Sequence, residues 1–99
     1  MADLGLSDAA LATYETLERD QSRWTTLDAL DEALERIVRA PGSREARLRR
    51  FQDPACFAVP VVTPESDWIV LWRPVTMDDE FVDLVEGDVF VLYLGPLPD

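Results

Sequence analysis

Six arginines lie within residues 36–50, and that segment contains a single acid, Glu45. If Ser43–Phe51 is helical, arginines spaced by three share one face, and guanidinium groups on one face suit a phosphate or an acidic partner. The other interpretation is a solvated connector that balances the acids of neighbouring elements. The candidate binding residues in this segment are Arg44, Arg47, Arg49 and Arg50.

The span Asp78–Asp88 holds six acids and no base. Carboxylates can coordinate a divalent cation, but a calcium loop needs alternating ligands and a central glycine, and this spacing has neither. We expect a solvated loop, whose further use is to complement an arginine-rich surface on this chain or on another. For residues 74–87 the pattern leaves open whether they form one helical turn or a loop.

The chain has no histidine and no lysine, and Cys56 is its only cysteine. It therefore lacks the commonest general acid–base, the Schiff-base nucleophile and the usual zinc ligands. Cys56 has no histidine to activate it, so we expect an inert buried thiol. We expect no metal site and no cofactor. The composition argues more against enzymes than for any one enzyme, and catalytic activity stays an open question.

Two short apolar runs, Trp68–Trp72 and Val89–Leu94, are rich in aromatic and β-branched residues, which predicts strands. Both faces of the first run are largely apolar, which is typical of a strand in the middle of a sheet. A third strand is expected at Cys56–Thr63, where Pro60 confines it to an edge or a bulge. The turn at Pro64–Asp67 predicts antiparallel pairing between this strand and the central one.

Two amphipathic helices are expected before the strands. Ser7, followed by an acid, is a good helix start and predicts a helix over Ser7–Asp20. Thr25 and Asp28 fit a capping box, and the apolar period behind them predicts a second helix over Thr26–Arg39. The short connector between the two helices favours an antiparallel hairpin, with the apolar stripes of both helices facing the sheet.

The predicted fold class is α+β, with an N-terminal antiparallel helix hairpin packed on a small antiparallel sheet of three to four strands. We expect one domain over residues 1–99, with residues 1–6 as a frayed lead-in, and whether they form a strand stays open. The N-terminus lacks a positive start and a long apolar run, and no stretch approaches the ~20 apolar residues of a membrane span. A soluble, cytoplasmic protein with no membrane contact is the expectation.

The order of helix, helix, arginine-rich link and three strands resembles the bacterial RelE/ParE toxin superfamily. The resemblance is carried by ALDEALERIVRAPGSREARLRRF (Ala29–Phe51), followed by the strands FAVPV, DWIVLWRPV and DVFVLYLG. It implies a small toxin of a toxin–antitoxin type system, in which a helix hairpin packs on an antiparallel sheet. The targets that it implies are ribosome-bound mRNA or gyrase.

In the ribonuclease branch of that superfamily, basic and histidine residues near the last strands do the work. Here Gly95-Pro96 stands in that region, Arg73 is the only base after Arg50, and Tyr93 remains near the end of the last strand. The resemblance therefore implies an atypical member, or one that lacks the mRNA-cleaving residues. It adds Arg73 and Tyr93 to the candidate binding residues.

The net charge of −11 supports an alternative: a non-enzymatic, acidic interaction module, immunity- or inhibitor-like, that binds a basic partner. We expect the partner to be another protein, docking on Arg36–Arg50 or on Asp78–Asp88. Nucleic-acid binding is expected to be weak or absent, because the acids outside the arginine segment oppose it. The identity of the partner stays open, as does a homodimer.

Overall fold

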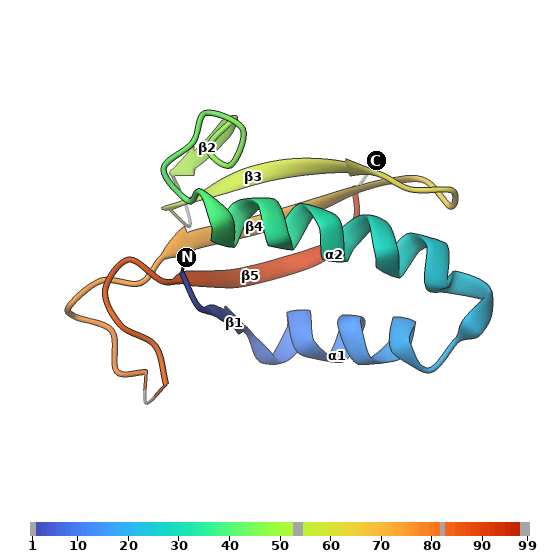
Figure 1. Ribbon diagram of the computed structural model, residues 1–99, viewed down its shortest axis with the longest axis horizontal. Helices are drawn as coiled ribbons and strands as arrows, with labels where there is room; N and C mark the ends of the chain where they lie inside the picture. Colours follow the sequence, from blue (N-terminus) through green and yellow to red (C-terminus); the bar gives the residue numbers. More distant parts are fainter. Residues whose placement is uncertain (1, 53–54, 82, 98–99) are drawn as a thin grey trace.

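The computed structural model describes residues 2–52, 55–81 and 83–97. Within them the chain forms two α-helices and a five-stranded mixed sheet, an α+β architecture (Figure 1). The elements, in chain order, are β1 (Leu4–Leu6), α1 (Asp8–Glu18), the short 3-10 helix η1 (Gln21–Arg23), α2 (Trp24–Arg39), β2 (Arg49–Gln52), β3 (Ala55–Val62), β4 (Asp67–Pro74) and β5 (Val89–Pro96). None of the helices in the described residues has the length and apolar character needed to cross a membrane.

The strands lie in the order β1-β5-β4-β3-β2, so β4 is at the centre, as its two apolar faces predict. The pairs β2–β3, β3–β4 and β4–β5 are antiparallel, with an irregularity in register between Leu71 and Trp72. β3 is not at the edge of the sheet as Pro60 led us to expect, because β2 pairs with its first half; Pro60 itself lies in the half that pairs only with β4. The expected sheet of three to four antiparallel strands is too small, because β1 and β2 were both missed.

The expectation that residues 1–6 are a lead-in is wrong. Leu4–Leu6 pair in parallel with Val89–Val91, at one edge of the sheet. The backbone N–H of Asp3 donates to the buried carboxylate of Asp88 over 3.1 Å, which ties the start of the chain to the start of β5. Three residues are too few for a period, and their partners lie more than 80 positions away, so the sequence around them carries no signal for this strand.

The first helix begins as expected and the second does not. Ser7 is the N-cap of α1, and its hydroxyl accepts a hydrogen bond from the backbone N–H of Ala10 over 3.1 Å. The capping box at Thr25 is wrong, because α2 already begins at Trp24 and its N-cap makes no side-chain hydrogen bond. The reason is that η1 continues directly into α2, so the connector is itself helical and leaves no break for a cap.

Both helices bury their apolar stripes against the same face of the sheet, as predicted. Figure 1 shows the chain running out along α1 and back along α2 across that face. The residues that form the shared core are Ala10 and Leu17 of α1, Leu30, Ala33, Leu34 and Ile37 of α2, and Val61, Trp68, Val70, Trp72, Val89, Val91 and Leu94 of the strands, with Ala46 from the link. The core therefore lies between one helix layer and one sheet layer.

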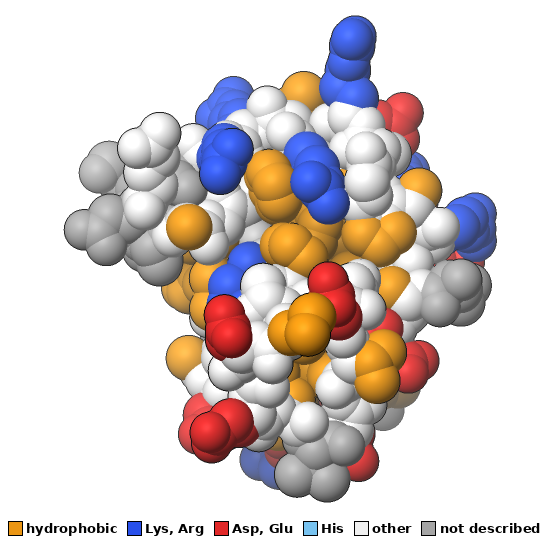
Figure 2. Space-filling view, turned by 90° about the vertical axis from the view of Figure 1, so that its left-hand side faces the viewer, with side chains coloured by type: hydrophobic (Ala, Val, Ile, Leu, Met, Phe, Trp, Pro, Cys, Tyr) orange, Lys and Arg blue, Asp and Glu red, His pale blue; other side chains and the backbone are white. Residues whose placement is uncertain are grey.

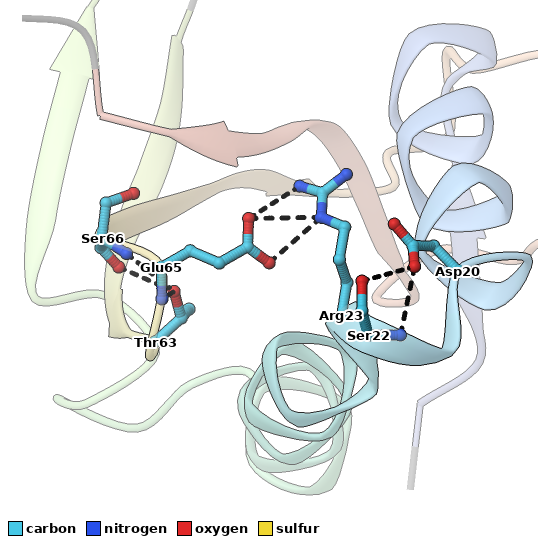
Figure 3. A network of polar contacts seen from close by, with 6 residues as sticks. All are labelled: Asp20, Ser22, Arg23, Thr63, Glu65 and Ser66. Carbon is cyan, nitrogen blue, oxygen red and sulfur yellow. Dashed lines mark hydrogen bonds and ion pairs between the residues drawn. The ribbon is translucent and has the colours of Figure 1, made fainter.

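A polar network fastens the helix connector to the β3–β4 turn (Figure 3). Arg23 at the end of η1 donates through Nε and Nη2 to the carboxylate of Glu65, over 3.0 to 3.2 Å, and lies over the ring of Trp68. These hydrogen bonds hold the pKa of Glu65 below its usual value. The hydroxyl of Thr63 accepts from the backbone N–H of Glu65 and of Ser66, which shapes the turn that presents the carboxylate.

Candidate functional site

The arginine-rich link is held by the central strand of the sheet. Residues 41–48 form successive turns rather than a helix, and the chain then enters β2, a strand that the sequence did not predict. Trp72 of β4 is fully buried, and its Nε1 donates a 2.8 Å hydrogen bond to the carbonyl of Ala46. Ala46 is itself buried, and its N–H donates to the hydroxyl of Ser43. The link is therefore fixed by its middle, with its arginines arranged around that point.

Three of the expected binding residues, Arg47, Arg50 and Arg73, line one pocket of about 360 Å³, which we call the arginine pocket. They come from the link, from β2 and from β4. The other residues that line it are Ala55, Cys56, Phe57, Pro74 and Thr76. Figure 2 shows this end of the molecule: arginine side chains (blue) gather around hydrophobic ones (orange) in the upper half, and acidic side chains (red) lie mainly below them.

Arg47 is held in place by aromatic rings. Its guanidinium lies 4.7 Å from the centroid of Phe57 and 5.9 Å from that of Trp72, within the range of cation–π attraction. Its Nε donates to the carbonyl of Pro41 over 2.8 Å. Its two terminal nitrogens make no hydrogen bond with any other described residue. They remain as donors for a bound anion.

Arg50 reaches the pocket through the register of the sheet. It lies opposite Phe57 in the β2–β3 pair, and Phe57 lies opposite Trp72 in the β3–β4 pair. Directly opposed residues in antiparallel strands project to the same face, so Arg50 projects to the face on which the helices pack. Arg50 is exposed, and the described part of the chain supplies it with no ion-pair partner.

Arg73 already has a partner. Its two terminal nitrogens donate to both carboxylate oxygens of Asp79, over 2.8 and 2.9 Å, and its guanidinium lies over the rings of Phe90 and Phe81. Asp79 also accepts from the backbone N–H of Thr76. The bonds from Arg73, followed by that from Thr76, hold the pKa of Asp79 well below its usual range. Among the described residues, the positive charge of the pocket that no acid pairs with therefore comes from Arg47 and Arg50.

The other expected binding residues lie elsewhere. Arg44 is exposed on the link and does not line the pocket. Arg49 pairs with Ala58 and Tyr93 pairs with Leu71, so they lie in one cross-strand row on the sheet face opposite the helices. The hydroxyl of Tyr93 donates to the carbonyl of Pro96. Of the six expected binding residues, three therefore line the arginine pocket, and Arg44, Arg49 and Tyr93 do not.

The sheet face opposite the helices, which we call the outer face, is mostly apolar. Its middle carries Ala58 and Pro60 from β3, and Ile69 and Leu71 from β4. Ala58 and Ile69 are buried, at 0 and 6 % exposed. The described part of this face also carries Arg49 and Tyr93 in one row, and Arg73, which alternates with the inward-facing Trp72 along β4, projects to the same face.

The acidic span forms a loop that folds back on the sheet. Phe81 packs on Phe90 with 4.6 Å between the ring centroids, and the carboxylate of Asp88 is buried and accepts from the N–H of Val85. Asp79 is the residue of this loop that bonds to the lining of the arginine pocket, through Arg73 and Thr76, and sequence reasoning treated it only as one acid among six. The spacing of Thr76 and Asp79 was the available signal, because an acid three residues after a threonine can accept from its backbone N–H.

Cys56 lines the arginine pocket but is 4 % exposed, and burial raises the pKa of its thiol above the usual value. Within residues 2–52, 55–81 and 83–97, no three Cys, Asp or Glu side chains come together in a way that would hold a metal ion.

Comparisons of the chain with protein-family models, with curated proteins and with solved structures find no match. The chemistry that this site offers is thus the binding of an anion by guanidinium groups.

Proposed function

We propose that this chain is an atypical RelE/ParE-like toxin of a toxin–antitoxin type system, which binds its target without cleaving mRNA. The observation that carries the proposal is the arginine pocket, in which residues from the link, β2 and β4 meet at one end of the sheet. Guanidinium groups bind carboxylates and phosphates through paired hydrogen bonds, so such a pocket is suited to an anionic group of a target.

The arrangement of the elements supports the proposal. In the superfamily that the sequence resembles, a helix hairpin packs on a small antiparallel sheet, and the chain usually opens with a β-strand, which the short, polar residues 1–6 did not suggest. The chain has β1 before α1, and β2 to β5 follow α2 as an antiparallel succession. The order of the elements supports the likeness in fold, and the arginine pocket supports a role in binding.

The outer face of the sheet supports binding over cleavage. Ala58 and Ile69 are buried there, and Arg49 and Tyr93 lie in the same cross-strand row without a histidine or lysine to share proton transfer. General acid–base catalysis needs a group with a pKa near the operating pH, and histidine, the commonest such group, is absent from the sequence.

Growth of a bacterial host under controlled expression tests the proposal. The wild-type chain is expected to slow growth, and the double variant R47Q/R50Q is expected to restore it. The matched control is R44Q/R49Q, which removes the same charge from the same segment outside the pocket and should remain inhibitory. Primer extension on ribosome-bound mRNA should reveal no new ends. Wild-type expression without any effect on growth contradicts the toxin-like function.

A second candidate, the acidic interaction module, is favoured by a different observation. The loop after β4 exposes Met77 and Val85, at 82 and 69 % of their surface, among its acidic residues. Apolar side chains within a charged surface are typical of a protein contact. This candidate predicts a complex with a basic partner that is lost in D78K/E80K, whereas R47Q/R50Q leaves it intact. The opposite dependence favours the toxin-like function.

A further inference from the structure

We infer that the arginine pocket is a site for a compact phosphate-bearing anion, such as free phosphate or a nucleoside monophosphate. The inference deepens the proposed function, since it names the ligand class of the same pocket and rests on that pocket's being a binding site. It commits to a small ligand and excludes a long nucleic acid.

The pocket supplies donors of the right kind and number. A guanidinium offers five N–H groups in a fixed fork, and such groups match the oxygen spacing of phosphate. Arg47 and Arg50 have donors that no other described residue uses, and they enter the pocket from two different elements. Thr76 also lines the pocket, and its hydroxyl already donates to Asp79 over 3.2 Å, so the free donors are those of the two arginines. A tetrahedral oxyanion between these groups can accept from more than one direction.

The pocket is also preorganised. The Arg47 guanidinium lies against the ring of Phe57, and its Nε is bonded to the Pro41 carbonyl, so little side-chain freedom is lost when an anion binds. The volume of about 360 Å³ lies at the small end of the range for ligand pockets, which is roughly 300–1,000 Å³. That space holds a phosphate and part of the group that it is attached to, with Phe57 and Pro74 as the apolar lining.

Asp79 marks where an oxyanion binds and limits how tightly a second one does. Its carboxylate already accepts from both terminal nitrogens of Arg73, so this guanidinium has an oxyanion in its fork. Arg73 lines the pocket, so a phosphate that binds there competes with the Asp79 carboxylate for its guanidinium, while Arg47 and Arg50 offer theirs freely among the described residues. Asp79 is therefore an internal competitor, and removal of its charge strengthens binding of the ligand.

The neighbouring surface restricts the ligand to a small one. The acidic residues of the loop after β4 lie on the same end of the molecule as the pocket, below the arginines in Figure 2. A polyanion that continued past the pocket toward this loop would meet their negative charge, whose field is screened beyond about 8 Å at physiological salt. A phosphate with one nucleoside extends less far across that surface. The local field thus selects for a compact ligand against an extended chain of phosphates.

The test is a titration of the ¹⁵N-labelled chain followed by NMR at about 0.15 M salt. Inorganic phosphate, AMP, adenosine and a single-stranded RNA are the probes. Phosphate and AMP are expected to shift the amides that line the pocket, and adenosine is expected to leave them unmoved. Tighter binding of AMP than of phosphate identifies a nucleotide site, and equal binding identifies a phosphate site. RNA that binds more tightly than AMP overturns the commitment to a compact ligand.

Arg49 and Arg50 provide a matched pair of variants, because they are neighbours on β2 that project to opposite faces. R50Q is expected to weaken phosphate binding by about 10- to 100-fold, the loss typical of a charge-assisted hydrogen bond. R49Q removes the same charge and is expected to change affinity by about twofold or less. If the two variants weaken binding equally, the effect is general charge attraction and the site is refuted.

Asp79 and its neighbour Asp78 provide the second pair. D79N is expected to tighten phosphate binding several-fold more than D78N, which changes the net charge identically at an exposed position. Equal effects of the two variants refute the internal competitor. If phosphate fails to bind while R47Q/R50Q still restores growth, the pocket takes a carboxylate of a protein, and only this inference fails. If phosphate binds and growth is never inhibited, only the proposed function fails.

Discussion

Replacement of Trp72 by Phe tests whether the central strand positions the arginine-rich link. Trp72 is fully buried on β4, and its Nε1 donates to the carbonyl of Ala46, a residue that is 3 % exposed. Phe keeps an aromatic ring in the core and removes the donor. The carbonyl of Ala46 then loses its partner from β4 at a place where water has little access.

The expected loss of stability is about 2–4 kcal/mol. A buried acceptor left without a partner costs about 1–3 kcal/mol. The smaller ring leaves an unfilled space that adds about 1 kcal/mol, as the removal of a few buried atoms does in other cores. A chain of this size has a total stability of about 5–15 kcal/mol, so this loss is a large fraction of it. The measurement is urea denaturation, in which the midpoint falls while the slope stays unchanged.

A second measurement separates anchoring of the link from general weakening. Amide hydrogen exchange in Ser43–Leu48 should rise more than in the helices, because the bond to Trp72 is what fixes that segment. The control is Trp24→Phe, which removes a bond to the carbonyl of Glu18 from a side chain that is 47 % exposed, and should cost under about 1 kcal/mol. A loss below about 0.5 kcal/mol for Trp72→Phe, or unchanged exchange in the link, refutes the reasoning.

Three further changes test other contacts. The folded-state pKa of Asp79 is depressed, so the stability that its carboxylate contributes is fully present above its unfolded pKa of about 4. That contribution is lost as the pH falls toward the lower folded value. Urea midpoints between pH 7 and pH 2 should therefore drop less in D79N than in the wild type. Gly87 has a φ of 93°, so Gly87→Ala should cost about 1–2 kcal/mol in urea denaturation, whereas Gly42→Ala, with open space around its Cβ, should be nearly neutral. Arg23→Gln breaks an ion pair with Glu65 in which both side chains are about a third exposed, so a loss of about 1 kcal/mol or less is expected, and a larger one in thermal denaturation contradicts that estimate.

The helices and the three long strands were accessible from sequence because each carries a local signal of sufficient length. Leu30, Leu34 and Ile37 repeat at a helical period, and all three are in the core. The run Trp68–Trp72 has two apolar faces, and the strand that contains it lies at the centre of the sheet. In each case the spacing of the apolar residues also indicates which side of the element is buried.

The two edge strands were missed because their pairing is what makes them strands. β1 has three residues, and its hydrogen bonds go to β5 at the other end of the chain. β2 begins at Arg49 within a run of arginines, a composition that predicts solvent exposure and favours no strand. Its partner β3 supplies the ladder, so its structure is decided by tertiary contacts that no short window of sequence contains.

Tertiary contacts also decide which arginines line the pocket. A helical link would have grouped Arg44, Arg47 and Arg50, whereas turns followed by a strand place Arg47 and Arg50 at the pocket and direct Arg49 to the other face. Arg73, near the end of β4, also lines the pocket. The anion binding that we propose therefore depends on this local arrangement, since the acids that make the net charge −11 are screened beyond about 8 Å at physiological salt. An acidic protein can in this way present a cationic pocket, provided that its ligand is small enough to stay within it.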